Sequence, residues 1–186
     1  MLMRIEAWGR EEREPVELPE SVRAETWQTL TYLMIAGGIM LFTTFSASYL
    51  VRRQSADWAP ARLPDLVWVN LAVVGAASVT MELARRGGAS ARRWLGSTIA
   101  LGVLFVAGQA IAWRQLAAQG VFLTSSPHAS FFYMLTAVHA AHVAAGLAVL
   151  LAALRRAGNG QLGLCAAWWH FVGAAWAWVV MLLTFF

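Results

Sequence analysis

The sequence predicts an all-α fold: a polytopic membrane protein built as a bundle of five transmembrane helices. Hydrophobic residues make up 59% of the 186 residues and charged residues only 13%, which lies outside the usual range of soluble globular domains. The apolar residues are gathered in five long runs with short polar links between them. Each run has about the 20 residues that a helix needs to cross a hydrocarbon core about 30 Å thick. We therefore expect one domain, residues 27–186, to contain all five helices.

A charged stretch, residues 1–26, precedes the first apolar run. It contains seven glutamates and four arginines. Pro15 and Pro19 prevent a long helix here, although the last few residues can begin the first helix. The stretch has no apolar core of signal-peptide length, so we expect an extramembrane tail on the cytoplasmic side.

The predicted helices follow in order along the chain. They lie at residues 27–51, 66–84, 94–118, 129–154 and 164–186. Residues that commonly flank helices stand in the links: Pro60, Pro64 and Pro127 near the starts, and Gly87, Gly88, Gly158 and Gly160 after the ends. The short links predict helices that run alternately up and down through the membrane.

The arginines indicate the orientation of the bundle. Ten of the fourteen lie in the tail and around the links after the second and fourth runs, and four lie toward the other side. The positive-inside rule then places the N-terminus, with the charged tail, in the cytoplasm and the C-terminus outside. Because these arginines form short clusters and no continuous face, we expect no nucleic-acid partner.

Polar residues inside membrane spans are functional candidates, since burying them costs free energy. His139 and His142 are three residues apart, which puts them on one face of a helix, and Gly146 continues that face. A neighbouring helix can approach closely at the glycine and meet the histidines. Two hypotheses follow: hydrogen bonds between helices, or a pair of ligands for a metal or haem. The buried polar set is Asn70, Gln109, Thr136, His139, His142 and His170.

Glu82 is the one acid in any predicted span, and it lies near the cytoplasmic end. Arg85 and Arg86 follow it at helical spacing, so we expect an ion pair at the membrane interface. The sequence presents no acid–base pair, no nucleophile with its base and no phosphate-binding loop. Cys165 is the single cysteine, which excludes an intrachain disulfide and a thiolate metal cluster. We therefore expect no catalytic site in this chain.

Two motifs relate the chain to a known family. The run SFFYMLTAVHAAHVAAG at residues 130–146 closely resembles the SFF…TGxHGxHVxxG signature of subunit III of the haem-copper cytochrome oxidases. The run AWWHFVGAAW at residues 167–176 resembles that family's YWHFVDxxW segment. Weaker matches occur at residues 101–113 and 63–80. The resemblance covers residues 27–186 and points to the five-helix form of the family.

The resemblance implies a noncatalytic subunit that packs against subunit I, with subunit II as a further neighbour. It implies haem and copper in those partner subunits, no cofactor or metal in this chain, bound phospholipids, and a supporting role in proton uptake. His139, His142 and His170 then have structural roles between helices, together with Thr136, Gln109, Asn70 and Glu82. The residues that we assign to lipid or subunit contacts are Trp168, Trp169, Trp176, Arg85 and Arg86.

The chain departs from the family at three membrane positions where acids are usual. These positions hold Gly38, Ala112 and Gly173. Two alternatives therefore stay open: an accessory subunit of a nitric oxide reductase with the same fold, and an independent membrane protein that binds haem or metal. We also hypothesise that the tail acids Glu11, Glu12 and Glu14 contact other subunits or raise the local proton concentration.

Overall fold

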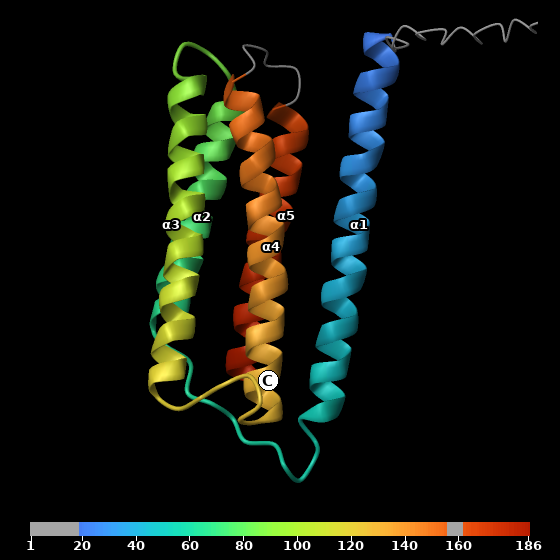
Figure 1. Ribbon diagram of the computed structural model, residues 1–186. Coiled ribbons are helices and arrows are strands. Elements are labelled where there is room, and N and C mark those ends of the chain that lie inside the picture. The colour runs from blue at the N-terminus through green and yellow to red at the C-terminus, as the bar shows by residue number, and fades with distance from the viewer. Residues whose placement is uncertain (1–18, 156–161) are drawn as a thin grey trace, which may run out of the picture.

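The computed structural model describes residues 19–155 and 162–186, and this part of the chain forms five α-helices and no strand (Figure 1). The helices are α1 (Glu20–Arg52), α2 (Leu66–Arg85), α3 (Ala91–Ala118), α4 (Pro127–Arg155) and α5 (Leu162–Phe185). Each is long and apolar enough to cross a membrane. The predicted all-α bundle of five membrane helices is thereby confirmed.

Helix α1 extends further toward the N-terminus than its apolar run. It begins at Glu20, directly after Pro19, so residues 20–26 of the predicted tail are helical. Its 33 residues make a helix about 50 Å long, which exceeds the hydrocarbon thickness of a bilayer. The tail acids Glu11, Glu12 and Glu14 and the predicted turn at residues 158–160 lie outside the described residues.

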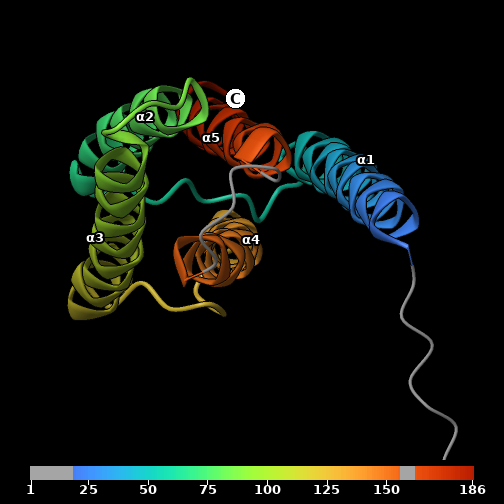
Figure 2. The same cartoon turned by 90° about the horizontal axis from the view of Figure 1, so that it is seen from above.

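The helices form a curved row with one helix inside the curve (Figure 2). Seen along their axes, α3, α2, α5 and α1 follow one another around the row, and α4 lies on its concave side. Helices α2 and α3 form a closely packed hairpin, and α5 packs against α2 and α4. Helix α1 is held by α4 and α5, the last two helices of the chain.

Burial differs strongly between the helices. Helix α5 buries residues along most of its length, because α1, α2 and α4 surround it. Helix α1 buries only one narrow stripe of four residues, namely Gly38, Phe42, Ser46 and Tyr49. The rest of its apolar surface is exposed on the isolated chain, which in a membrane means contact with lipid or with another protein.

The links between helices use glycine where the backbone requires it. Gly87 and Gly88 have φ angles of +80° and +87° in the link from α2 to α3. Gly120 has a φ of +75° after α3, and the Val121 amide donates back to the Leu116 carbonyl. This left-handed conformation is costly for other residues, so these glycines end their helices sharply.

Candidate functional site

His139 lies at the centre of the bundle, halfway along α4. It is fully buried, and the rings of Phe105 and Trp176 stand 5.3 and 5.0 Å from its own, centroid to centroid. Neither ring nitrogen of His139 has a hydrogen-bond partner among residues 19–155 and 162–186. The hydrogen bond to another helix that we expected for this residue is therefore not formed with the described side chains.

His142 lies on the same face of α4, as its spacing from His139 predicts. Both rings contact Phe42 of α1, at centroid distances of 6.3 Å for His139 and 5.7 Å for His142. The Nδ1 atom of His142 lies 2.8 Å from the Val138 carbonyl of its own helix. Because a carbonyl only accepts, Nδ1 is the donor in this hydrogen bond. This bond stays within α4, so it differs from the expected contact between helices.

Hydrogen bonds between helices occur at three other predicted residues. The Trp113 indole of α3 donates to the Thr136 hydroxyl of α4 over 2.9 Å. The Asn70 amide of α2 donates to Gln109 of α3 over 3.5 Å, and both side chains are buried. These contacts connect α3 to both of its neighbours within the apolar part of the bundle.

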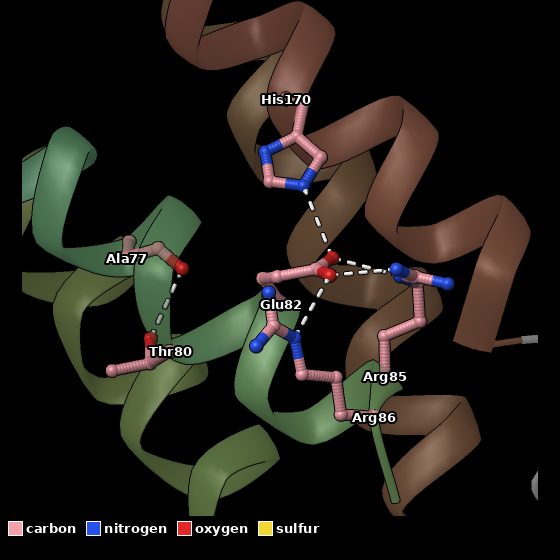
Figure 3. A network of polar contacts seen from close by, with 6 residues as sticks. All are labelled: Ala77, Thr80, Glu82, Arg85, Arg86 and His170. Atoms are coloured by element: carbon pink, nitrogen blue, oxygen red, sulfur yellow. Dashed lines mark hydrogen bonds and ion pairs between the residues drawn. The ribbon is translucent and has the colours of Figure 1, made fainter.

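Glu82 stands in a charged cluster that joins α2 to α5 (Figure 3). Its carboxylate accepts two hydrogen bonds from Arg85, over 2.6 and 2.7 Å, and one from Arg86 over 3.2 Å. His170 of α5 approaches from the other side, with Nε2 at 3.8 Å from a carboxylate oxygen. The predicted ion pair of Glu82 with the two arginines is present, and His170 brings a side chain of α5 next to it.

The tryptophans of α5 do not form a lipid or subunit surface as a group, which corrects our assignment. Trp169 and Trp176 are buried within the chain, and only Trp168 is partly exposed. A Cβ atom built on Gly102 of α3 would lie 2.7 Å from the tip of the Trp169 ring, and one built on Gly146 of α4 would lie 2.7 Å from Trp168 Nε1. Gly146 lets α5 approach α4 closely, as predicted, and Gly102 makes room on α3 for the tip of the Trp169 ring.

Small residues fill the three positions where the family resemblance implies acids. A Cβ atom built on Gly38 would lie 2.5 Å from the Phe171 ring, and one on Gly173 would lie 2.9 Å from the Ser78 hydroxyl. Ala112 is completely buried. At Gly38 and Gly173, neighbouring side chains occupy the space that an acidic side chain would need, so these two departures agree with the packing of this chain.

His128 is a structural residue that our sequence analysis missed. It is buried at the start of α4, where its Nδ1 accepts from the Ala61 amide over 3.1 Å. Its Nε2 lies 3.4 Å from the Leu183 carbonyl near the end of α5. The edge of Trp58 packs against its ring. His128 thus joins the link between α1 and α2 to two helices. Its place directly after Pro127, just before the start of the fourth predicted span, is the sequence feature that could have identified it.

An ion pair also holds the link from α1 to α2. Arg52, at the end of α1, binds both carboxylate oxygens of Asp57 over 2.6 and 2.7 Å. The hydrogen bonds from Arg52 hold the pKa of the Asp57 carboxyl below its usual range. Asp57 therefore stays charged at neutral pH and keeps the link folded back toward the helix.

The comparisons with known proteins decide the family. No protein-family model matches the chain. A relative from Mycobacterium tuberculosis, named "Probable cytochrome c oxidase subunit 3", is 32% identical over 165 residues, covering 78% of this chain and 81% of the relative. The chain belongs to the cytochrome c oxidase subunit III family.

Further relatives in this family come from other bacterial groups. "Cytochrome c oxidase subunit 3" of Synechocystis sp. is 30% identical over 161 residues, covering 77% of this chain and 68% of the relative. The subunit 3 protein of Bacillus sp. strain PS3 is 23% identical over 165 residues, covering 80% of both proteins. These identities make the chain a divergent subunit III. It is a multi-pass bacterial membrane protein and part of a multisubunit oxidase of the respiratory chain.

Proposed function

We propose that this subunit III is a noncatalytic member of a haem-copper terminal oxidase and packs against subunit I, with subunit II as a further neighbour. The observation that carries the proposal is the family relationship over about four-fifths of the chain. Oxygen reduction then takes place at haem and copper in the partner subunits. The role of this chain is to hold its neighbours and lipids in place and to support proton uptake.

The polar residues described above suit this structural role. The pairs Trp113–Thr136 and Asn70–Gln109 join helices through neutral hydrogen bonds, each worth about 1 kcal/mol in membranes. His142 has one ring nitrogen engaged within its own helix, and His139 lies on that same helix. A haem held by two histidines needs them on facing helices, so this arrangement does not favour an independent haem protein.

The exposed apolar surface of α1 is the proposed contact area for lipid and for subunit I. Only one stripe of this helix packs against α4 and α5. Large apolar side chains cover the remaining sides, among them Trp27, Leu30, Leu33, Met40 and Val51. We expect phospholipid chains and a helix of subunit I to cover this surface, because neither requires polar partners there.

The proposed orientation places the start of α1 and the link from α2 to α3 in the cytoplasm. Arg85, Arg86, Arg92 and Arg93 lie at or near this link and are exposed. Positive charge at cytoplasmic helix ends supports the orientation, and it also suits contact with anionic lipid headgroups.

The test is to isolate the tagged subunit from its native membrane in mild detergent and record a reduced-minus-oxidised spectrum of the isolated material. We expect a large haem protein to accompany the chain and to consume oxygen. Turnover of nitric oxide without oxygen consumption would assign the chain to a nitric oxide reductase. A colourless preparation without haem protein would contradict the proposal, and a haem spectrum from the chain alone would support the independent haem protein.

A further inference from the structure

The centre of the bundle contains polar atoms that the described side chains leave unpaired. Both ring nitrogens of His139, Nε1 of Trp176 and Nε2 of Gln109 have no hydrogen-bond partner within residues 19–155 and 162–186. All three side chains are at most 1% exposed. A buried polar group without a partner costs about 1–3 kcal/mol, so several together require an explanation.

His139, Trp176 and Phe105 come from three helices and meet at one level of the bundle. His139 of α4 and Trp176 of α5 are in contact, with ring centroids 5.0 Å apart and planes inclined by 34°. Phe105 of α3 touches both rings, at 5.3 Å from His139 and 4.9 Å from Trp176. Gln109 follows Phe105 by one helical turn on the same face of α3.

Gln109 therefore lies one turn beyond the level of these three rings. Its oxygen accepts from Asn70 of α2, and its amide nitrogen is unpaired.

We propose that the contact of His139 with Trp176, here called the central junction, binds a water molecule inside the membrane-spanning part of this subunit. A neutral imidazole offers one donor and one acceptor, and the indole nitrogen offers a donor. Water can accept from Trp176 and donate to the unprotonated ring nitrogen of His139. Buried waters typically make about three such bonds to otherwise unpaired groups.

Other ligands match this set of groups less well. A metal ion needs several lone-pair donors, and the described part of the chain has no group of three or more His, Cys, Asp and Glu side chains that could hold one. The unpaired indole nitrogen of Trp176 can only donate, which repels a cation. An anion would need a positive charge, and the arginines of these helices lie toward their ends. Water supplies both donors and acceptors without charge.

The test is radiolytic hydroxyl labelling of the purified complex that contains this subunit, followed by mass spectrometry. A bound water generates the radical in place, so buried residues beside it are oxidised although bulk solvent does not reach them. We expect millisecond exposure to label Trp176 and Phe105. Phe132 of α4 is the matched control, because it is equally buried and lies outside the central junction.

A variant distinguishes labelling by the bound water from labelling by bulk solvent that enters the bundle. His139→Phe keeps a flat ring but removes both nitrogens, and it should reduce the labelling of Trp176 at least threefold, toward the level of Phe132. Wild-type labelling of Trp176 as weak as that of Phe132 would overturn the proposal, and this result needs no variant. Strong labelling of Trp176 that persists in a folded His139→Phe complex would also overturn it.

Discussion

The tip of the Trp169 ring occupies the space that a side chain at Gly102 would need. The two residues belong to α5 and α3, and a Cβ atom on Gly102 would come within 2.7 Å of Trp169 Cη2. On α4, Gly146 accommodates the neighbouring Trp168 in the same way. Glycines on two helices thus receive consecutive tryptophans from a third, which fixes how far α5 enters the bundle.

Gly102→Ala should destabilise the subunit, because the new methyl group meets the Trp169 ring and Leu147. Overpacking of this kind costs about 1–3 kcal/mol. We expect a lower temperature at which the subunit unfolds or leaves the complex, measured by heating in detergent and gel filtration. Gly96→Ala in the same helix is the control, since a Cβ there meets no heavy atom within 4 Å. Equal behaviour of the two variants would contradict the packing described here.

Trp113→Phe should weaken the contact between α3 and α4. The change keeps most of the ring but removes the donor to Thr136. We expect a loss of about 1 kcal/mol, the usual size of such bonds in membrane bundles. The measurement is the same thermal dissociation, with Trp94→Phe as control, because the Trp94 ring is partly exposed near the start of α3. A larger loss for Trp94→Phe would argue against this assignment.

His128→Ala should loosen the link between α1 and α2. It removes the acceptor for the Ala61 amide and the contact with the Leu183 carbonyl. Leaving buried backbone groups unpaired costs about 1–3 kcal/mol. We expect faster proteolytic cleavage within residues 53–65 and a lower unfolding temperature. His170→Ala, at a half-exposed histidine, should leave cleavage of this link unchanged. Equal rates of cleavage within residues 53–65 in the two variants would contradict the structural role of His128.

Cysteine labelling should decide the orientation. Ser90→Cys lies in the link from α2 to α3, and Thr124→Cys lies in the link from α3 to α4; both residues are exposed. With the N-terminus in the cytoplasm, a membrane-impermeant maleimide added to intact cells should label Thr124→Cys only. The wild-type chain gives the background, because Cys165 is buried. Labelling of Ser90→Cys alone would reverse the proposed topology.

Much of the fold follows from the sequence, because length and hydropathy determine which segments can cross a membrane. Four of the five predicted spans agree with the helices to within a few residues, and α1 is longer because its charged first turns remain helical. The ion pair of Glu82 with Arg85 and Arg86 was predictable because it depends only on spacing within one helix.

The features that the sequence did not predict depend on how the helices are arranged around one another. Trp169 and Trp176 looked like lipid-facing residues, since a helix that is apolar on all sides can face lipid or be buried. Whether His139 finds a polar neighbour depends on the rotation of α3 and α5 around it, and periodicity within α4 carries no information on that. The hydrogen bonds of His128 join segments 55 and 67 residues away in the chain, beyond the reach of any local pattern.

The way α1 is attached has a consequence for biogenesis. Of the five helices, α1 leaves the ribosome before the others, yet the helices that hold it, α4 and α5, are made after the other three. Helices α2 and α3 can pair as soon as both are inserted, whereas α1 has to wait in the lipid until α4 and α5 are inserted. Among these helices, the one made first is therefore docked last, and a ribosome that stalls before α4 leaves α1 without the helices that hold it.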